Sequence, residues 1–533
     1  MKKVLVMPSP PTPNGDLHLG HLAGPYLRAD IVTRYLKMRG REVYFFTGSD
    51  EHQSYVARRA EQLGIDTLQA ADMFDKTITE TLEAAKIDVD VYSVPRRLAY
   101  HADMVRDMFE DLYSRGKLVA KEEPCLYCEA CEQYLFEAYV SGKCPHCGAG
   151  CAGCACETCA RPNNCTDLVD PVCSRCGDRP AARTFTRLYF PLRQSEEQLR
   201  RYHATAMMSP HMRSVCEQMM AEGLPDIPVT HFTDWGIEAP LAEFAGQCFY
   251  VWFEMVAGEL AATQDMCEKV GLTEGWRQFW TSDQVDVVKC FGCDNSYFYG
   301  ILFPAVAMTY KTEINPPNIF LNNEFYRLDG MKFSTSRKHA IWGSDILKRT
   351  PVDNLRFYLS YTAPEAEQTN FTMGEYESTV QRELVEGVQA WLEELGDRVD
   401  AETDGTAPAV DLTAAERTEF FSRLKRFHDE VAEAYEPRTF SNRRAARLLI
   451  ELASEARRLP NEAEDSAVIA LELASAKSLA MLSAPIMPGF AAELWRGLGY
   501  QTPIDWEDAP SFVEAGARIE SLNKNYFAEA VTA

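Results

Sequence analysis

The first fifty residues alternate apolar runs with a polar break, a pattern that predicts strand, loop, helix and strand. Residues 4–7 form a short apolar run suited to a buried strand. Residues 8–15 then interrupt regular structure with four prolines and an Asn-Gly pair. Apolar side chains recur at helical spacing through residues 27–38, and residues 43–46 form a second apolar run. This order predicts a βαβ unit, and therefore a parallel sheet with helices on its faces.

The α/β pattern returns later in the chain after an interruption. A cysteine-rich segment occupies about residues 116–193. Beyond it, residues 249–252, 285–289 and 318–321 have the apolar character of buried strands. From about residue 374 the pattern is helical almost to the end of the chain. We therefore expect one α/β unit, interrupted by a cysteine-rich module and followed by helices.

The helical part contains a linker and a recognisable helix start. Residues 397–411 are polar and acidic, and we interpret them as a linker between helices. Thr413 and Glu416 have the spacing of a capping box, which predicts the start of the next helix. Behind them an apolar stripe at helical spacing predicts the buried face of that helix: Phe420, Leu424, Phe427 and Val431.

Length and composition limit the class of protein. The chain has 533 residues, enough for roughly two to four domains. Hydrophobic residues make up 46% and charged residues 25%, which is ordinary for a globular protein. No apolar run is long enough to span a bilayer, and the stretch before Pro8 is too short for a signal peptide. We therefore expect a cytoplasmic protein with no membrane partner.

The charge balance bears on partners. The formal net charge is 54 − 79 = −25. Proteins that hold long stretches of nucleic acid usually carry a basic surface, because phosphate contacts supply much of their affinity. The acidic balance therefore disfavours a nucleic-acid partner, although a local basic patch remains compatible with it.

The cysteines indicate metal sites. Of the 17 cysteines, 12 lie between Cys125 and Cys176, a density that in a small secreted protein would indicate disulfides. In a long chain without a signal peptide, C-x-x-C pairs favour metal instead. Four pairs supply the thiolates for two structural Zn²⁺ sites with four cysteines each. They are Cys128/Cys131, Cys144/Cys147, Cys156/Cys159 and Cys173/Cys176, and Cys125, Cys151, Cys154 and Cys165 are additional.

Two short motifs carry the candidate chemistry. Residues 13–21 read Pro-Asn-Gly-Asp-Leu-His-Leu-Gly-His, so that His18 and His21 can both face an anion at a helix start. Residues 329–338 add hydroxyls and cations, Lys332 among them. A His-x-x-His pattern alone usually has no such meaning. Together the two motifs suit a nucleoside triphosphate whose pyrophosphate leaves.

The motifs resemble those of a known family. His18-Leu-Gly-His21 is similar to the HIGH signature of class I aminoacyl-tRNA synthetases, and Lys332-Phe-Ser-Thr-Ser336 is similar to their KMSKS loop. Residues 46–52, 249–252 and 294–298, with the cysteine knuckles, resemble the methionyl-tRNA synthetase branch. The likeness covers residue 1 to about 375 and, more loosely, the helical tail.

The resemblance implies a fold and a domain order. It implies an α/β fold: a class I synthetase Rossmann-type parallel sheet with an inserted zinc-knuckle module and a C-terminal helical bundle. It also implies nested zinc sites, in which the inner C-x-x-C pairs share one ion and the outer pairs the other. The expected domains are 1–115 and 211–325 for the two halves of the catalytic domain, 116–210 for the zinc-knuckle insertion, 326–375 for the loop and stem-contact region, and 376–533 for the anticodon-binding-like bundle.

The resemblance also implies site residues and cofactors. The implied cofactors are ATP with Mg²⁺ and Zn²⁺, and the implied substrate is an amino acid. The implied catalytic residues are His18, His21 and Lys332. Asp50 would hold the substrate α-amino group. The other implied residues are Asn14, Gly15, Gly20, Asp294, Ser334 and Ser336 at ATP, and Thr12, Trp252, Glu259, Asn295 and Tyr299 around the amino acid.

The amino-acid pocket departs from the family. The family surrounds methionine with a leucine-proline-tyrosine, an alanine-proline and tyrosine, and an isoleucine and histidine. A buried polar group without a partner costs on the order of 1–3 kcal/mol, so a pocket that gains a carboxylate, an amide and a hydroxyl disfavours methionine. We expect Glu259 beside Trp252 to favour a substrate that bears an amine or several donors. The residues that stand at the family positions are Pro10, Pro11 and Thr12, then Met255, Val256 and Glu259, then Asn295 and Tyr299.

The loop and the tail depart as well. Thr335 replaces the second KMSKS lysine, and Arg337 or Lys338 is the candidate to compensate for it. His231 stands where the family has an arginine after the zinc module. In the tail, where the family reads its anticodon, this chain shows Glu386, Ala390 and Glu394, then Pro460-Asn461 without a tryptophan. Carboxylates repel RNA, and the missing aromatic removes a stacking platform worth roughly 1–3 kcal/mol.

Two functions follow from these departures. The preferred hypothesis is a paralogue that adenylates a different amino acid and passes it to a small-molecule nucleophile, as the synthetase-like half of hydrazine-forming natural-product enzymes does. It requires a separate cupin partner, because this chain has no cupin sequence. The alternative is a translation enzyme that charges tRNA with methionine, with the departures as ordinary drift. A non-catalytic role is disfavoured, because His18, His21 and Lys332 are all present.

Overall fold

A five-stranded parallel sheet forms the centre of the catalytic half. Its strand order is β16-β15-β1-β2-β3, and all pairs are parallel. Side chains alternate across β1, so that Val4 and Val6 pack in one core and Leu5 and Met7 in the other. Both faces are therefore covered, as expected of a parallel sheet. The strands are β1 (Lys3–Pro8), β2 (Val43–Gly48), β3 (Val91–Ser93), β15 (Val285–Gly292) and β16 (Ile319–Asn323).

The predicted βαβ unit is confirmed, and one predicted strand is wrong. Helix α2 (Leu27–Met38) connects β1 to β2 as expected. The segment 249–252 is not one strand, because β14 (Gln247–Phe249) ends there and α8 (Val251–Lys269) begins. Tyr250 keeps an extended backbone at the N-cap, with φ −66° and ψ 126°. The apolar run is thus shared by a strand end and the first turn of a buried helix, which periodicity alone cannot separate.

The cysteine-rich segment forms small antiparallel sheets of its own. Strands β4 (Val119–Cys128) and β11 (Ala181–Pro191) pair over nine residue pairs and belong to a four-stranded sheet. Strands β6 (Val140–Lys143) and β10 (Val169–Cys173) belong to a three-stranded sheet. A separate small core holds the cysteines together. The module therefore packs largely around its own sulfur atoms.

The tail is helical, as expected, with two corrections. Helix α14 (Ala390–Thr403) continues through the first half of the expected linker. Thr413 lies inside α15 (Leu412–Glu416), and Asp411 accepts a hydrogen bond from the Ala414 N–H at 3.2 Å, so the capping-box prediction is wrong. The apolar stripe does lie in one helix, α16 (Glu419–Tyr435), which Thr418 caps. The expected stripe residues are buried there.

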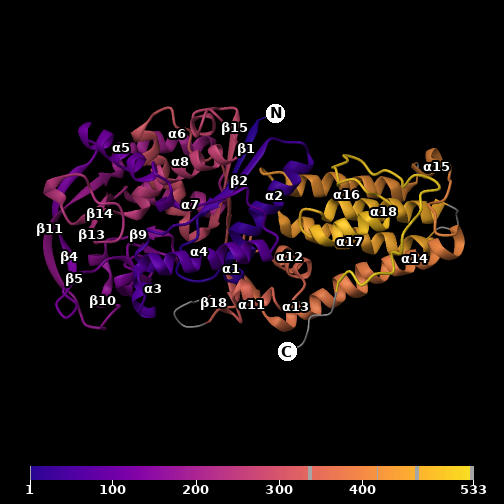
Figure 1. Cartoon of the computed structure of the whole chain (residues 1–533), viewed down its shortest axis with the longest axis horizontal. Coiled ribbons are helices and arrows are strands. Elements are labelled where there is room, and N and C mark those ends of the chain that lie inside the picture. Colours follow the sequence, from indigo (N-terminus) through magenta and orange to yellow (C-terminus); the bar gives the residue numbers. More distant parts are fainter. Residues whose placement is uncertain (1, 334–338, 417, 463–466, 528–533) are drawn as a thin grey trace.

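The structure is a computed structural model that describes residues 2–333, 339–416, 418–462 and 467–527. Figure 1 shows the cysteine-rich strands at one end of the long axis, the parallel sheet in the middle and the tail helices at the other end. The tail helices α17 (Asn442–Glu462) and α18 (Ala467–Ser483) belong to the same core as Val4 and Val6. Among the described helices, none is both long and apolar enough to cross a membrane.

Candidate active site

The two histidines of the first motif cap a helix start and stack on each other. Their ring centroids lie 3.7 Å apart with an interplanar angle of 9°. His18 Nδ1 accepts from the His21 N–H, and His21 Nδ1 accepts from the His18 N–H, each at 3.3 Å. Because both Nδ1 atoms accept, each neutral ring carries its proton on Nε2. The pair therefore presents two Nε2–H donors.

Both imidazoles are neutral near pH 7. Burial, followed by the charges of His21 and Lys332, lowers the pKa of His18 well below its usual value. Desolvation by the surrounding protein lowers the pKa of His21 to about 4, although part of its ring keeps contact with solvent. Gly20 makes room for this arrangement, because a Cβ there would lie 3.0 Å from His18 Cε1. A neutral imidazole still donates its Nε2–H to a phosphate oxygen.

The loop motif comes to the same place through a tight hairpin. Strands β17 (Tyr326–Leu328) and β18 (Met331–Lys332) pair across Asp329 and Gly330, whose φ angles are 47° and 77°. Positive φ at both residues is the mark of a type I′ turn, for which Asp-Gly is a preferred sequence. The ring of Phe333 then stacks on His18 at 4.7 Å. The structure thus brings together the two motifs that the sequence singled out.

The segment after the loop completes the contact. His18 pairs with Trp342 in an isolated bridge, and the Gly343 N–H donates to the Leu17 carbonyl at 2.6 Å. Asp16 accepts hydrogen bonds from Thr81 Oγ1 at 2.6 Å and from the Ser344 N–H at 3.0 Å. Chain on both sides of the loop is therefore anchored to the HLGH turn. Ser334, Thr335, Ser336, Arg337 and Lys338 lie outside the described residues.

Lys332 pairs with the cysteine-rich module. Its Nζ contacts the carboxylate of Glu157, which lies between Cys156 and Cys159. The Nζ also lies 4.4 Å from the centre of the Phe325 ring. Burial and the charge of Glu157 raise the pKa of Asp294 to about 6, against the opposing charge of Lys332. Lys332 thus lies within electrostatic reach of both His18 and Asp294.

Asn14, Gly15 and Asp294, expected at ATP, and Thr12 and Asn295, expected around the amino acid, lie in the loop after β1 and in the turn after β15. Asn14 donates its backbone N–H to the Thr12 carbonyl at 2.9 Å, and Gly15 follows in the same partly exposed loop. Asn295 donates to Asp294 Oδ1 at 3.4 Å. Thr12 is partly exposed and is not among the residues that line the cavity described below. Asn14 and Gly15 precede the HLGH turn in the chain, and Asp294 lies within electrostatic reach of Lys332.

Asp50 occupies a buried position at the end of β2. Its carboxylate accepts from Gln53 Nε2 at 2.7 Å, and its backbone N–H donates to the Pro11 carbonyl at 2.9 Å. Burial raises its pKa to about 8, with further contributions from Glu254 and Glu137. A carboxylate held this way gains from a cationic partner, because a positive charge restores its ionised form.

The aromatic residues around the amino-acid pocket pack closely. Trp252 lies within 6.2 Å of Tyr250, 5.9 Å of Tyr297 and 5.4 Å of Phe298, measured between ring centroids. The Tyr299 hydroxyl accepts from Ser9 Oγ at 3.2 Å. Trp252 and Tyr299 therefore belong to one aromatic layer between α8 and the turn after β15.

Sequence reasoning missed a lysine in this pocket. Lys289 Nζ lies 2.5 Å from Glu259 Oε1, and both side chains are almost fully buried. Lys289 also lies 4.6 Å from the centre of the Tyr299 ring. Burial lowers the pKa of Lys289, and the charge of Glu259 opposes that shift. Glu259 is thus already neutralised, a fact hidden in the sequence because 30 residues separate the partners.

The eight predicted cysteine ligands form two clusters with the expected nesting. Cys128, Cys131, Cys173 and Cys176 form the outer cluster. The inner cluster consists of Cys144, Cys147, Cys156 and Cys159. Sulfur pairs lie 3.4–3.9 Å apart. Tetrahedral zinc with bonds of about 2.3 Å requires sulfur separations of roughly 3.8 Å. The donors fit zinc, and each cluster could hold one ion.

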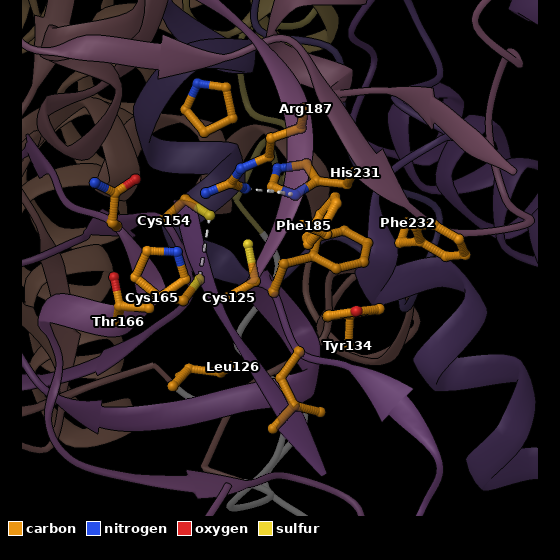
Figure 2. A pocket seen from close by; sticks show the side chains of 15 residues that line it. Cys125, Leu126, Tyr134, Cys154, Cys165, Thr166, Phe185, Arg187, His231 and Phe232 are labelled. Atoms are coloured by element: carbon orange, nitrogen blue, oxygen red, sulfur yellow. Dashed lines mark hydrogen bonds between the residues drawn. The ribbon is translucent and has the colours of Figure 1, made fainter. Parts of the chain in front are cut away.

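Two cysteines that belong to neither cluster lie close together between the inner cluster and the catalytic half. Cys154 Sγ lies 3.4 Å from Cys165 Sγ, beside Arg187 and His231, as Figure 2 shows. Arg187 donates to His231 Nδ1 at 3.4 Å, and His231 stacks on Phe136 at 4.5 Å. Arg187 of β11 therefore brings a guanidinium next to His231, the residue that stands where the family has an arginine.

The chain is similar in sequence to proteins of known family. A family model described as "tRNA synthetases class I (M)" matches residues 4–393. The methionine–tRNA ligase of Methanopyrus kandleri is 32% identical over 532 residues, covering 96% of this chain and 78% of that protein. The Pyrobaculum aerophilum ligase is 30% identical and covers 97% and 93%. The Thermomicrobium roseum ligase is 31% identical and covers 92% and 86%.

Solved structures agree in fold. Mycobacterium tuberculosis methionyl-tRNA synthetase in complex with methionyl-adenylate superposes with a TM-score of 0.76 at 19% identity, covering 97% of this chain and 98% of that chain. The apo form of the same protein gives a TM-score of 0.72 at 16% identity, covering 100% and 99%. At these identities the likeness shows the fold alone.

Proposed function

The chain belongs to the methionyl-tRNA synthetase family of class I aminoacyl-tRNA synthetases, and on this premise we propose that it activates an amino acid with ATP and transfers it to tRNA. As a member of this family it is a ligase that forms an aminoacyl-adenylate. Methionine, the amino acid in the relatives' names, is the first substrate to test. The observation that carries the proposal is the stacked His18–His21 pair beside the Lys332 hairpin.

The site residues suit the first half-reaction. The substrate carboxylate attacks the α-phosphorus of ATP, the bond to the β-phosphate oxygen breaks, and pyrophosphate leaves. The Nε2–H groups of His18 and His21 donate to phosphate oxygens as charge builds there. Lys332 exchanges Glu157 for the leaving pyrophosphate. Asp50 holds the substrate ammonium group, and Asp294 lies beside the adenosine. ATP enters with Mg²⁺, which neutralises part of the phosphate charge.

We infer that the acceptor of the activated amino acid is tRNA rather than a small molecule. The relatives named above are tRNA ligases, which favours tRNA over the small-molecule nucleophile and cupin partner expected from the sequence. Glu394 also repels RNA less than the sequence alone indicates. Glu394 is paired with Arg457 at 2.5 Å, and Arg457 also donates to the Glu386 carbonyl. The carboxylate thus carries its own counter-charge.

A second candidate function is activation of a different amino acid for a small-molecule nucleophile. One observation favours it, the buried Glu259–Lys289 pair in the amino-acid pocket. A methionine side chain has no donor or charge to match these groups. This pair bears on which amino acid is activated and does not bear on which molecule accepts it.

One experiment tests the proposal. We expect the purified protein to catalyse amino-acid-dependent exchange of pyrophosphate into ATP, and to attach the same radiolabelled amino acid to total tRNA. Exchange without tRNA charging, together with acylation of an added hydroxylamine or amine, would favour the second candidate. Absence of exchange with every amino acid would reject both.

The raised pKa of Asp50 predicts a pH dependence. Below about pH 8 the free carboxyl group is mostly protonated and cannot hold the substrate ammonium group. The KM for the amino acid should therefore fall roughly tenfold for each pH unit between about pH 6 and 8, and level off above. Asp50→Asn should bind weakly at every pH with a flat profile. A wild-type KM that does not change with pH would contradict this role.

The remaining expectations are part of the same proposal. We include in it the five domain ranges given above and the roles of Asn14, Gly15, Gly20, Thr12, Trp252, Asn295 and Tyr299. We also include two structural zinc ions, one in each cysteine cluster. They stabilise the module without taking part in the chemistry, because all four positions of each ion are filled by protein.

A further inference from the structure

A cavity opens next to Asp50, and most of its exposed wall is apolar. The empty space in it, with the solvent at its mouth included, is about 590 Å³. The loops after β1, β2 and β3 form one side, and α8 with Lys289 of β15 forms the other. Apolar side chains such as Leu98 and Met255 line part of the wall. Asp50, the residue expected to hold the α-amino group, lines the cavity together with Glu259, whereas Trp252, Asn295 and Tyr299 do not line it. We place the substrate side chain here because the cavity adjoins Asp50.

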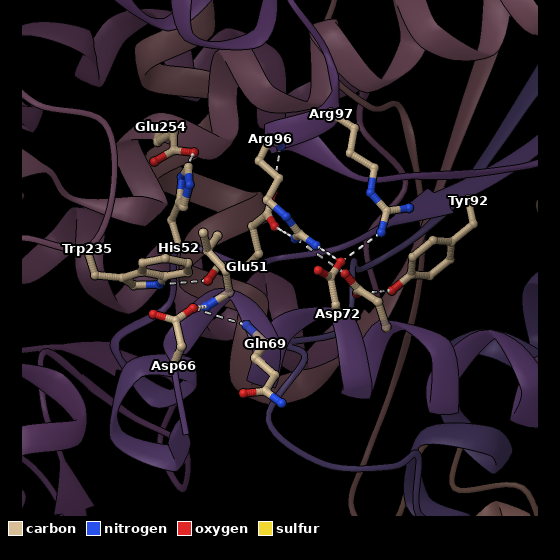
Figure 3. Close-up of polar contacts among 12 residues, drawn as sticks. Glu51, His52, Asp66, Gln69, Asp72, Tyr92, Arg96, Arg97, Trp235 and Glu254 are labelled. Atoms are coloured by element: carbon tan, nitrogen blue, oxygen red, sulfur yellow. Dashed lines mark hydrogen bonds and ion pairs between the residues drawn. The ribbon is translucent and has the colours of Figure 1, made fainter. Parts of the chain in front are cut away.

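Two carboxylates on α8 face this cavity. Glu254 and Glu259 both line it and are 4% and 5% exposed. Glu259 Oε1 is bound by Lys289 at 2.5 Å. Glu254 Oε1 contacts His52 Nδ1 at 2.7 Å, as Figure 3 shows, and His101 Nε2 at 3.0 Å. Each carboxylate is therefore held through one oxygen only.

The second oxygen of each carboxylate has no partner. Glu254 Oε2 and Glu259 Oε2 are buried and accept no hydrogen bond from a described residue. An ionised carboxylate can only accept hydrogen bonds. Buried acceptors of this kind are rarely left unsatisfied in folded proteins. A ligand group that reaches either oxygen would therefore have to donate a hydrogen bond to it.

The charges in the cavity are balanced in pairs. Lys289 neutralises Glu259. Burial lowers the pKa of His52, but the charge and hydrogen bond of Glu254, together with the charges of Glu51 and Asp50, raise it to about 9. His52 is therefore cationic at neutral pH and neutralises Glu254. The cavity lining also contains the carboxylates of Asp50 and Glu51, and Glu51 is paired with Arg96 (Figure 3). A charged side chain would leave an unbalanced charge in a buried site, which is costly.

Stability does not explain the Glu259–Lys289 pair. Replacing a buried ion pair with apolar residues of similar size is often neutral or stabilising. A pocket for an apolar side chain would therefore lose nothing in stability by having apolar residues at both positions. The pair is better explained by what it recognises.

We propose that this cavity selects an amino acid with an uncharged side chain that donates hydrogen bonds, an amide or a hydroxyl, and that Glu259 and Lys289 determine this specificity. The inference rests on the proposed adenylation and replaces methionine as its substrate. The oxygen Oε2 of Glu259 accepts a hydrogen bond from the substrate side chain. Lys289 holds the carboxylate in place and balances its charge.

The test is pyrophosphate exchange over a panel of amino acids. The panel contains glutamine, asparagine, serine, threonine and tyrosine as donors, methionine and leucine as apolar side chains, and lysine and glutamate as charged ones. We expect the highest kcat/KM for a member of the donor group, and a value for methionine lower by about tenfold or more. Highest activity with methionine, leucine or a charged amino acid would overturn the inference.

A paired variant tests the assigned residues. Glu259→Leu with Lys289→Met removes both charges together, so that no unpaired charge remains buried. It should lower kcat/KM for the preferred amino acid about tenfold or more and raise that for methionine or leucine. The matched control is Asp265→Leu with Lys269→Met, which removes another carboxylate–lysine pair of α8 at 2.8 Å outside the cavity lining. An unchanged order of preference in the first variant would overturn the assignment.

Direct binding separates this inference from the proposed function. Thermal-shift titration with each amino acid, without ATP, reports on the pocket even if no exchange occurs. Stabilisation by the donor group without exchange would reject adenylation and keep the pocket assignment. Exchange with a donor amino acid without tRNA charging would reject only the acceptor. Stabilisation by methionine alone would reject the pocket assignment.

Discussion

Replacement of either histidine of the HLGH motif by alanine is expected to lower pyrophosphate exchange by roughly 100- to 1,000-fold. Each ring presents one Nε2–H donor, because its Nδ1 is already used as an acceptor, and in the proposed reaction this donor binds the phosphates. Removal of one such preorganised donor costs about this much in other enzymes. The measurement is the initial rate of exchange at saturating ATP and amino acid, with His18→Ala and His21→Ala beside the parent.

Two further substitutions separate catalysis from folding. Asparagine places its side-chain polar atoms near the position of Nδ1, and glutamine reaches the position of Nε2. His21→Asn should therefore keep the cap and lose activity, whereas His21→Gln should keep more activity than either alanine or asparagine. The melting temperature of all variants should stay close to that of the parent. Asparagine and glutamine variants of equal activity would argue against the assigned tautomer.

Loss of metal is the second large effect we expect. The purified protein should contain about two zinc ions per chain, as two four-cysteine clusters require. Binding of structural zinc contributes on the order of 10 kcal/mol in small zinc-dependent domains. Removal of zinc with a strong chelator should therefore unfold the cysteine-rich module, detected as loss of protease resistance between residues 116 and 193.

Single-cluster variants test the pairing. Cys144→Ser with Cys147→Ser should leave about one zinc per chain, held by the outer cluster of Cys128, Cys131, Cys173 and Cys176. The control Cys216→Ser changes a buried cysteine outside both clusters and should keep two. Elemental analysis with thiol titration gives both numbers. A parent protein with disulfides and no zinc would reject the metal sites.

Much of the candidate site was predictable, because the sequence motifs that form it join residues close together in the chain. The HLGH turn has its two histidines three residues apart, so that one helix start positions both. Each C-x-x-C pair likewise places two sulfur atoms on one turn. The second motif was tied to the first by the chemistry that the two suit together and by resemblance, and the structure supplies the physical link, the stacking of Phe333 on His18.

Other features were not predictable, because they join distant parts of the chain. The Glu259–Lys289 pair spans α8 and β15, and Arg187 reaches His231 across two strands. The prediction for residues 249–252 was wrong because a strand end and a helix start share one apolar run. The cap of α15 was misplaced by two residues because Asp411 competes successfully with Thr413.

The sequence by itself determined the family, most of the order of strands and helices, the histidine pair at a helix start and the cysteine pairs. These depend on short-range spacing, and the chain's local geometry converts spacing into position. Only the tertiary structure decided which charges meet. It showed that Glu259 and Glu394 are each neutralised by a basic residue more than 25 positions away. Electrostatic partners depend on folded distance and burial, and a carboxylate in the sequence therefore predicts a charge without predicting the field around it.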